Sequence, residues 1–377
     1  MSDTGGGHRA SAEALKAGFQ QAYAAQIQIE IIDLLMEHLP WPLNWPPRAY
    51  SFIVNEAAWL WKLLWLSGNH PEIVHRLAMG VARLGEHSIT QLFRAYEPDL
   101  IISVHPLVQE FVIRALAHMR RRIPFVTVVT DLATAHPLWF HSAVDACYVA
   151  SQEAYQRARQ AGIRPERIHS YGLPIRPAFA VPTRTKSVLR TQLKMDHDLP
   201  AALVVSGGEG VGPIEEIAEQ VAAQLLEQGR PVGQMVIICG RNVSLRQQMA
   251  ARAWPIPTLI HGFVQNMPEW MGACDCIITK AGPGTIAEAL ISGLPIILSG
   301  FIPGQEEGNI PYVVDHGVGV YCKTPVEIGA LVRHWFHQNP AKLAEMRAKA
   351  LALGSPQATT QIVHSIAQLL IPVRRAN

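Results

Sequence analysis

An apolar strand, a glycine-rich loop and a helix follow one another in residues 276–291, which read CIITKAGPGTIAEALI. The run Cys276–Thr279 is rich in β-branched residues, which favours a strand. Gly282 and Gly284 allow a tight turn, and Ile286–Ile291 continues as a helix. A glycine loop that opens a helix leaves backbone N–H groups at the positive end of the helix dipole. The stretch therefore predicts a phosphate site in an α/β fold.

A second copy of this pattern is the loop GGEGVGP at 207–213. It lies between the predicted strand Leu203–Ser206 and a helix that Pro213 opens at its first position, where the missing proline N–H costs nothing. A third loop, SDTGGGHR, begins at Ser2 and leads into helix-forming residues. Only Met1 stands before it, so this loop is either a terminal tail or a phosphate loop whose preceding strand is missing.

Short apolar runs alternate with longer helical stretches along the chain, which is typical of βαβ units and parallel sheets. The predicted strands are Ile27–Leu34, Leu100–Val104, Phe125–Thr130, Ala146–Ala150, Leu203–Ser206, Met235–Cys239, Thr258–Ile260, Cys276–Thr279 and Pro295–Leu298. This alternation of apolar runs and helical stretches is interrupted at 178–200, which predicts a linker there. The fold class is therefore α/β, with two doubly wound Rossmann-like domains at 1–177 and 201–377. We expect the last helix to cross back, and the active site to lie in a cleft between the domains.

The composition bounds the class of protein. A length of 377 residues predicts two or three domains, and 49% hydrophobic with 16% charged residues excludes a disordered chain. The net charge of +2 is too balanced to indicate a nucleic-acid partner, so we expect none. The five cysteines form no Cys-x-x-Cys pair, which favours a reducing cytoplasm and no metal site. The uncharged stretch 289–305 is broken by glycines and prolines, and no secretory signal is recognisable, so we expect an intracellular protein without a transmembrane span.

Tryptophan is concentrated in one segment. Five of the nine tryptophans fall within 41–65: Trp41, Trp45, Trp59, Trp61 and Trp65. Within the Trp-rich insertion 40–68, Tyr50–Leu66 reads as a helix with a thin polar stripe. This helix is either buried in the core or contacts something apolar outside the protein. Together with short basic clusters such as Arg120–Arg122, it is also typical of a protein that rests on an anionic bilayer.

Two polar features near the predicted strand ends each allow two interpretations. Glu288 is either an ordinary acid in the first turn of its helix or an acceptor for ribose hydroxyls. The loop PGQEEGN at 303–309 is either a polar surface loop or a set of donors and acceptors for sugar hydroxyls. Its position after the strand Pro295–Leu298 places it at the expected cleft.

Several motifs together resemble the monogalactosyldiacylglycerol synthases of glycosyltransferase family 28, which are related to the lipid II N-acetylglucosaminyltransferase. The motifs are SDTGGGHRASAEA from Ser2, VVTDL from Val128, HPLWFH from His136, GGEGVGP from Gly207, ITKAGPGTIAEAL from Ile278 and PGQEEGN from Pro303. The resemblance implies a GT-B fold and an inverting transferase that uses a UDP-sugar and diacylglycerol, without a cofactor. It assigns the acceptor and lipid to 1–177 and the UDP-sugar to 201–377. In the family a first strand precedes Ser2, and this strand is missing here.

The resemblance also implies roles for individual residues. His8 is the general base, and the acceptor side of the site comprises Asp3, Gly5, Gly6, Gly7, Asp131 and His136. The donor-binding residues are Gly208, Glu209, Gly210, Phe263, Gly282, Gly284, Thr285, Glu288, Gln305, Glu306 and Asn309. Within this set Phe263 lies near the uracil, 282–285 holds the diphosphate, Glu288 binds the ribose, and Gln305 and Glu306 contact the hexose. We expect no metal ion, because the backbone N–H groups at 282–285 can stabilise the leaving UDP without one.

We therefore predict an enzyme that moves galactose from UDP-galactose to the sn-3 hydroxyl of 1,2-diacylglycerol. Histidine is the side chain whose pKa lies nearest neutral pH, so His8 can take the proton of this weak nucleophile. We expect the enzyme to be cytoplasmic and peripheral on the inner face of the cell membrane, with the membrane surface and its anionic lipids as partners. The alternatives are transfer of glucose or N-acetylglucosamine to diacylglycerol or another lipid, a UDP-sugar epimerase, and a non-catalytic lipid- or nucleotide-binding protein.

Overall fold

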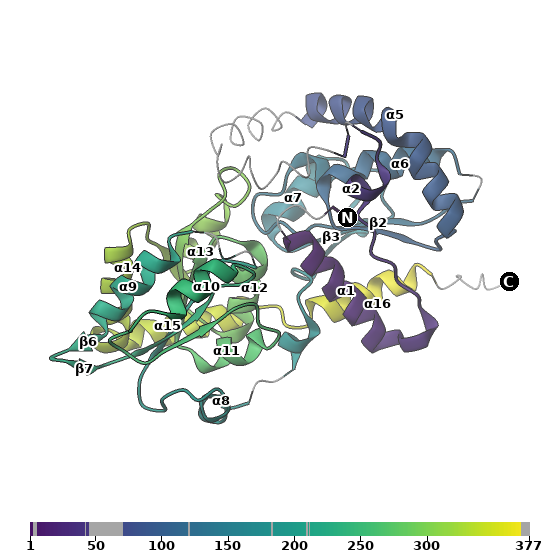
Figure 1. The fold of residues 1–377 in the computed structure, drawn as a ribbon. Coiled ribbons are helices and arrows are strands. Elements are labelled where there is room, and N and C mark those ends of the chain that lie inside the picture. The colour runs from purple at the N-terminus through teal and green to yellow at the C-terminus, as the bar shows by residue number, and fades with distance from the viewer. Residues whose placement is uncertain are drawn as a thin grey trace. The chain divides into compact units, whose positions relative to one another are not determined.

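The computed structural model describes residues 1–2, 6–41, 43–44, 71–119, 121–181, 184–208, 210 and 212–370. The chain divides into two compact units (Figure 1). Unit 1 comprises Met1–Pro177, Ile302–Gln305 and Gln357–Asn377, and unit 2 comprises Ala178–Phe301 and Glu306–Pro356. Most of the Trp-rich insertion, with the predicted helix Tyr50–Leu66, lies outside the described residues.

Unit 1 contains a parallel sheet whose four strands follow chain order. The strands are β1 (Ile101–Ser103), β2 (Phe125–Val128), β3 (Ala146–Val149) and β4 (Ile168–Ser170). All residues of β2 and β3 are buried, which explains why they read as continuous apolar runs rather than alternating ones. The predicted strands at 100–104, 125–130 and 146–150 are confirmed.

The predicted strand Ile27–Leu34 is wrong. Residues 27–33 belong to no sheet, and Leu34 already begins the short helix α2 (Leu34–His38). The carboxylate of Asp33 caps this helix by accepting the N–H of Met36 at 3.0 Å. Next to this segment, the Met1 ammonium donates to the Ile32 carbonyl at 2.9 Å, and the Leu34 N–H donates to the Met1 carbonyl at 2.8 Å. Pairing with one residue does not make a ladder, so the apolar run stays extended without becoming a strand.

The helices of unit 1 come from both ends of the chain. They include α1 (Gly7–Tyr23), α5 (Pro71–Tyr96), α6 (Gln109–Ala117), α7 (Gln152–Gln160) and α16 (Ala358–Gln368), with short 3-10 turns η1 (Ala24–Gln26), η2 (Pro106–Val108), η3 (Pro137–Trp139), η4 (Pro165–Arg167) and η5 (Pro177–Ala180). Helices α1 and α16 lie side by side, and Gly18 allows this approach because a Cβ there would lie 2.8 Å from Thr359 Cγ2. Leu15, Val126 and Ile362 share one core cluster, so the C-terminal helix completes the core of the N-terminal unit.

In the sheet of unit 2, later strands are added on both sides of the first strand. This parallel sheet has the order β12-β11-β10-β5-β8-β9. The strands are β5 (Ala201–Val205), β8 (Gln234–Ile238), β9 (Thr258–His261), β10 (Cys276–Lys280), β11 (Ile296–Gly300) and β12 (Gly319–Tyr321), and β6 (Leu226–Glu227) and β7 (Arg230–Pro231) form a separate hairpin. The winding reverses between β5 and β10, which is where ligands of doubly wound sheets bind. The five strands predicted after residue 200 are confirmed.

Helices alternate with these strands. They are α8 (Lys186–Gln192), α9 (Ile214–Gln224), α10 (Val243–Ala250), α11 (Met267–Ala273), α12 (Pro283–Ser292), α13 (Asn309–Asp315), α14 (Pro325–Arg333), the π-helical turn η6 (His334–Gln338) and α15 (Pro340–Leu353). One detail of the prediction is wrong, because Pro213 is the N-cap of α9 and Ile214 is its first residue. Thr324 caps α14 by accepting the N–H of Glu327, which fixes where that helix begins.

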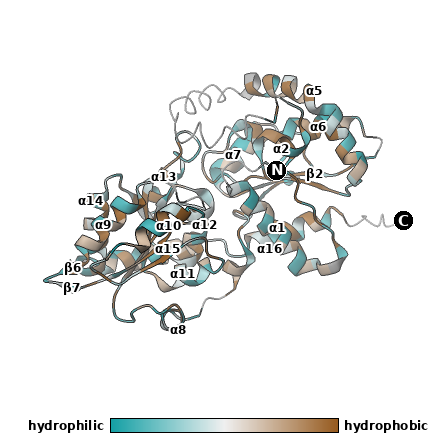
Figure 2. Cartoon of the chain, viewed as in Figure 1, coloured by the Kyte–Doolittle hydropathy of each residue, from teal (hydrophilic) through white to brown (hydrophobic). Residues whose placement is uncertain are grey.

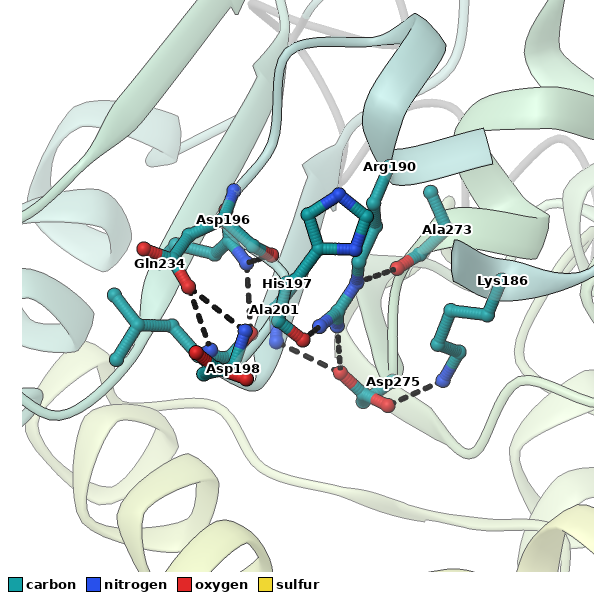
Figure 3. Close-up of polar contacts among 10 residues, drawn as sticks. Lys186, Arg190, Asp196, His197, Asp198, Ala201, Gln234, Ala273 and Asp275 are labelled. Carbon is teal, nitrogen blue, oxygen red and sulfur yellow. Dashed lines mark hydrogen bonds and ion pairs between the residues drawn. The ribbon is translucent and has the colours of Figure 1, made fainter. Parts of the chain in front are cut away.

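An ion pair between the buried Arg190 and the half-buried Asp275 holds α8, which lies within the predicted linker, at the amino ends of the strands (Figure 3). The guanidinium of Arg190 donates to the Asp275 carboxylate at 2.8 Å and to the carbonyls of Ala273 and His197 at 3.1 and 2.9 Å. Asp275 also accepts the N–H of Ala201 at 2.8 Å, where β5 begins. These contacts satisfy a buried charge. They lie at the edge of the sheet opposite the glycine loops, so we interpret them as structural.

Candidate active site

The predicted base lies in a cluster at the carboxyl ends of the strands of unit 1. His8 is the second residue of α1, after Gly6, whose φ of 77° supplies the left-handed turn into the helix. Its imidazole is buried, and its Nδ1 lies 3.0 Å from Oγ1 of Thr130, which follows β2. The ring of His105, which follows β1, lies 4.4 Å from the His8 ring, measured between centroids. Residues 122 positions apart thus fix the orientation of one imidazole.

His105 packs against His8 as a neutral ring. Its Nδ1 accepts the N–H of Leu107 at 3.2 Å, so Nδ1 carries no proton. Burial, together with the neighbouring His8, lowers the pKa of His105 well below its ordinary value. His105 therefore contributes shape beside His8 without adding a positive charge that would oppose proton uptake there.

Asp131 and His136 join this cluster through Trp139. The carboxylate of Asp131 accepts the indole N–H of Trp139 at 2.6 Å and the backbone N–H of His136 at 3.4 Å. The Trp139 ring, which is fully buried, lies 5.9 Å from that of His8. His136 Nδ1 accepts the N–H of Leu138 at 3.2 Å, and burial lowers the pKa of His136 to about 4. The structure thus brings three predicted residues together, while Gly7 is exposed and Asp3 and Gly5 lie outside the described residues.

The geometry gives His8 a defined chemistry. When Nδ1–H donates to the Thr130 hydroxyl, Nε2 carries the basic lone pair. A histidine in this tautomer accepts a proton from a hydroxyl that reaches Nε2. Thr130, His105 and Trp139 were not predicted as site residues, because their relation to His8 depends on the order of strands in the sheet rather than on local spacing.

The first glycine loop of unit 2 packs backbone against backbone on the loop after β8. Gly210 has φ of 60°, and a Cβ there would lie 2.1 Å from the Cys239 carbonyl oxygen. Gly240 has the same φ, and its Cβ would lie 2.2 Å from the Gly208 carbonyl oxygen. No other residue type fits either position. The sequence did not lead us to predict Gly240, although its place directly after a predicted strand could have indicated it. Glu209 lies outside the described residues.

The second glycine loop opens α12. Gly282 is the N-cap, Pro283 is the first helical residue, and among the described residues no side chain caps this end. The backbone N–H groups of the first turn therefore remain suited to an anion. Gly284 is exposed and Thr285 half-buried in that turn. Lys280, the last residue of β10, forms an ion pair with the buried carboxylate of Glu306 beside this loop.

The remaining predicted donor residues differ in their surroundings. Glu288 is half-buried and is the sixth residue of α12, so its interpretation as a first-turn acid is wrong. Phe263 is 51% exposed, and the guanidinium of Arg241 lies 5.1 Å from its ring centroid. Asn309 is buried and its amide donates to the Ala281 carbonyl at 2.9 Å, which ties the PGQEEGN loop to the Gly282 loop. Gln305 belongs to unit 1, whereas Glu306 belongs to unit 2.

His261 adds an unsatisfied group beside Phe263. Its Nε2 is buried and has no hydrogen-bond partner among the described residues, and its ring lies 4.5 Å from that of Trp270. Burial, reinforced by Arg246, lowers the pKa of His261. A buried polar atom without a partner is unfavourable unless a ligand satisfies it.

The described part of the chain shows neither a metal-binding cluster nor a membrane-spanning helix. No group of three or more His, Cys, Asp or Glu side chains there is arranged to hold a metal ion. None of the described helices combines the length and the apolar character that crossing a bilayer requires.

Comparison with known proteins decides the family. The family model described as monogalactosyldiacylglycerol (MGDG) synthase matches residues 8–175, and that of the glycosyltransferase family 28 C-terminal domain matches 201–362. Monogalactosyldiacylglycerol synthase 1, chloroplastic, of Arabidopsis thaliana is 48% identical over 382 residues, which cover 100% of this chain and 71% of the relative. The chain belongs to the MGDG synthase family. The MGDG synthase of Spinacia oleracea, also named chloroplastic, is 47% identical over 98% of this chain and 72% of its own length.

Solved structures show that this MGDG synthase family member has a GT-B-like fold. MurG of Acinetobacter baumannii has a TM-score of 0.54 at 17% identity, covering 75% of this chain and 77% of MurG. The complex of MnaA of S. aureus with UDP has a TM-score of 0.54 at 14% identity, covering 78% and 79% of the two chains. At these identities the likeness shows the fold alone. The predicted α/β class with two parallel sheets is confirmed.

Proposed function

We propose that the His8 cluster of unit 1 and the glycine loops of unit 2 together carry out the reaction of an MGDG synthase. The chain is a 1,2-diacylglycerol 3-beta-galactosyltransferase of family 28, which transfers galactose to diacylglycerol. The observation that carries the site assignment is the buried imidazole of His8, oriented by the Thr130 hydroxyl at 3.0 Å. The UDP-sugar is a substrate in this scheme, and the enzyme needs no cofactor.

The reaction needs a base at the acceptor. The sn-3 hydroxyl of diacylglycerol is a weak nucleophile, so His8 Nε2 takes its proton as the oxygen attacks C1 of galactose. The bond between C1 and the UDP oxygen breaks in the same step, and its electron pair leaves with UDP. Attack from the face opposite UDP inverts the configuration at C1. The Asp131 carboxylate holds the Trp139 ring in place beside the imidazole.

The leaving UDP needs donors that stabilise negative charge. Residues 282–285 at the start of α12 supply backbone N–H groups for the diphosphate. Gly208 and Gly210 border the same strand ends, Phe263 offers backbone groups to the uracil, and Glu288 accepts the ribose hydroxyls. Gln305 and Glu306 contact the hexose. Asn309 holds the loop that carries them, through its bond to Ala281.

A donor screen tests this function. The purified chain is mixed with vesicles that contain diacylglycerol and with UDP-galactose, UDP-glucose or UDP-N-acetylglucosamine in turn, and the lipids are separated by thin-layer chromatography. We expect monogalactosyldiacylglycerol from UDP-galactose alone. Preferential use of another UDP-sugar would reassign the donor, and no lipid product from any of the three would contradict the transferase.

We also propose that unit 1 contacts an anionic membrane surface through α5. Leu77, Val81 and Leu84 are 65%, 44% and 68% exposed, and their spacing puts them on one side of the helix. Arg76 and Arg83 are also exposed. Each directly precedes a leucine of this row, Leu77 or Leu84, and successive helical residues are about 100° apart, so both cations flank the apolar row. Figure 2 shows apolar and polar residues side by side along α5. An apolar row flanked by cations suits the interface of an anionic bilayer.

Sedimentation with vesicles tests this contact. Leu77→Gln with Leu84→Gln should weaken binding to vesicles of phosphatidylcholine and phosphatidylglycerol, while UDP affinity stays unchanged. The matched control replaces Val243 and Val326 of unit 2, which are 64% and 59% exposed, by glutamine. Equal losses in both double variants would exclude α5 as the contact. Peripheral placement on the inner face of the cell membrane remains part of the proposal.

A further inference from the structure

Lys280 lies where three loops of unit 2 meet. Its Cε lies 3.4 Å from the position that a Cβ would occupy on Gly207. Its Nζ lies 3.4 Å from the position that a Cβ would occupy on Gly282. The third loop contributes Glu306, whose carboxylate pairs with the Lys280 ammonium. The ammonium therefore stands between the loop after β5 and the N-terminus of α12, which flank the point where the winding of the sheet reverses.

The pair is unequally buried. The side chain of Glu306 is 5% exposed and that of Lys280 29% exposed. The carboxylate is thus withdrawn from water, and its Oε1 lies 3.7 Å from the Cβ position of Gly282. Lys280 is on a flexible four-carbon stem and reaches solvent at the loop. An anion that enters at the first turn of α12 competes with Glu306 for this ammonium.

We infer that Lys280 is a diphosphate-binding residue that exchanges Glu306 for the UDP moiety of the donor. This inference rests on the proposed function, in which 282–285 holds the diphosphate. In the structure the ammonium neutralises the buried carboxylate. When the UDP-sugar binds, Lys280 turns to the diphosphate, and Glu306 accepts a hydrogen bond from a hydroxyl of the sugar instead. The same carboxylate would otherwise repel the diphosphate.

The exchange serves both the binding of the donor and the departure of UDP. As the C1–O bond breaks, the electron pair passes to the oxygen of the UDP phosphate, and Lys280 offsets the added negative charge. Because the Glu306 carboxylate is released only when a diphosphate occupies Lys280, the sugar contact forms only for a correctly seated nucleotide. The pair therefore couples recognition of the phosphate to recognition of the sugar.

Calorimetry on single and double variants tests this inference, with UDP and uridine as ligands. Glu306→Gln removes the competitor, so UDP should bind several-fold more tightly than to the wild type while galactose transfer falls. The decisive comparison adds Lys280→Met to Glu306→Gln, which removes the ammonium without leaving a carboxylate uncompensated. We expect UDP affinity to fall about tenfold or more between these two, as for the loss of a hydrogen bond to a charged group. Uridine, which lacks the diphosphate, should bind both alike.

A matched ion pair on α15 supplies the control. Lys349→Met and Glu345→Gln break a pair 2.6 Å long on the surface of unit 2 and should leave UDP affinity unchanged. Weaker UDP binding in Glu306→Gln, equal UDP binding in the single and double variants, or parallel loss of uridine would each overturn the inference. Those outcomes leave the proposed function standing, which fails instead if the wild type makes no galactolipid. Lys280→Arg, which keeps the charge, should retain UDP binding and guards against a folding defect.

Discussion

The His8 cluster and the loops around Lys280 solve opposite electrostatic problems at the carboxyl ends of two parallel sheets. Around His8, neutral rings and hydroxyls pack closely, and burial lowers the pKa of both His105 and His136. Around Lys280, glycines expose the backbone, and an ammonium and a carboxylate face each other. A proton acceptor needs neighbours that do not carry positive charge, whereas a diphosphate site needs N–H groups and a cation.

The two regions also differ in what holds them. Side-chain hydrogen bonds hold the residues around His8 in place. A substitution that keeps the size of a side chain but removes its polar group should therefore be damaging there. Backbone conformation fixes the second region, where Gly210 and Gly240 each have φ of 60°.

Replacing the base should have the largest effect. His8→Ala removes the proton acceptor, so turnover of galactose transfer should fall roughly 100- to 10,000-fold, the usual contribution of general base catalysis. The measurement is the initial rate of lipid product at saturating UDP-galactose. A rate within a few-fold of the wild type would show that another group takes the proton.

Acidification should destabilise unit 1 through its buried histidines. His136 has a folded pKa of about 4 against an ordinary value of 6.5, so between these values the unfolded chain binds more protons. The free energy of unfolding should fall as the pH is lowered from 6.5 to 4, by up to about 3 kcal/mol for this residue. His136→Asn keeps an acceptor for the Leu138 N–H and should lose less stability on acidification. Identical pH dependence of the melting temperature in both proteins would contradict the assignment.

Removing the hydroxyl that orients the base should have a smaller effect. Thr130→Val keeps the shape but removes the partner of His8 Nδ1, so turnover should fall roughly 10- to 100-fold, as expected for a lost buried hydrogen bond of about 1–3 kcal/mol. Thr130→Ser should restore most of it. Thr90→Val serves as control, because that hydroxyl bonds only the Glu86 carbonyl within α5 among the bonds described. A serine variant as poor as the valine variant would indicate lost packing instead.

The smallest effect is expected at the ribose. Glu288→Gln keeps the length of the side chain but removes the charge of the acceptor, a loss of about 1.5 kcal/mol or more. UDP affinity measured by calorimetry should fall about tenfold, without any change in the pH dependence of turnover. Unchanged UDP affinity would remove Glu288 from the donor site.

The fold was largely predictable because strands buried on both faces read as continuous apolar runs. The run Ile27–Leu34 has the same composition, but Asp33 caps a helix there and no ladder forms. The strands β4 and β12 were missed because each has three residues and ends at an exposed one, whereas the equally short β1 contains no exposed residue. Local composition does not distinguish such short strands from loops.

The site was predictable where a role depends on local backbone and not where it depends on packing. Gly210 and Gly282 stand in glycine loops that the sequence itself marks. Thr130 and His105 reach His8 only because β1 and β2 are neighbours in the sheet. Lys280 was quoted within its motif but not assigned a role, since its position against Gly207 and Glu306 depends on three separate loops. All the roles assigned to site residues stay predictions, and Asp3, Gly5 and Glu209 lie outside the described residues.

The central claim is that unit 1 supplies the base and unit 2 binds UDP. Calorimetry of UDP binding to His8→Ala tests this claim most directly. The base belongs to unit 1 and the UDP-binding loops to unit 2, so UDP should bind this variant with the affinity of the wild type although galactose transfer is lost. A fall in UDP affinity that parallels the loss of turnover would contradict this account, because it would place His8 in the donor site rather than at the acceptor.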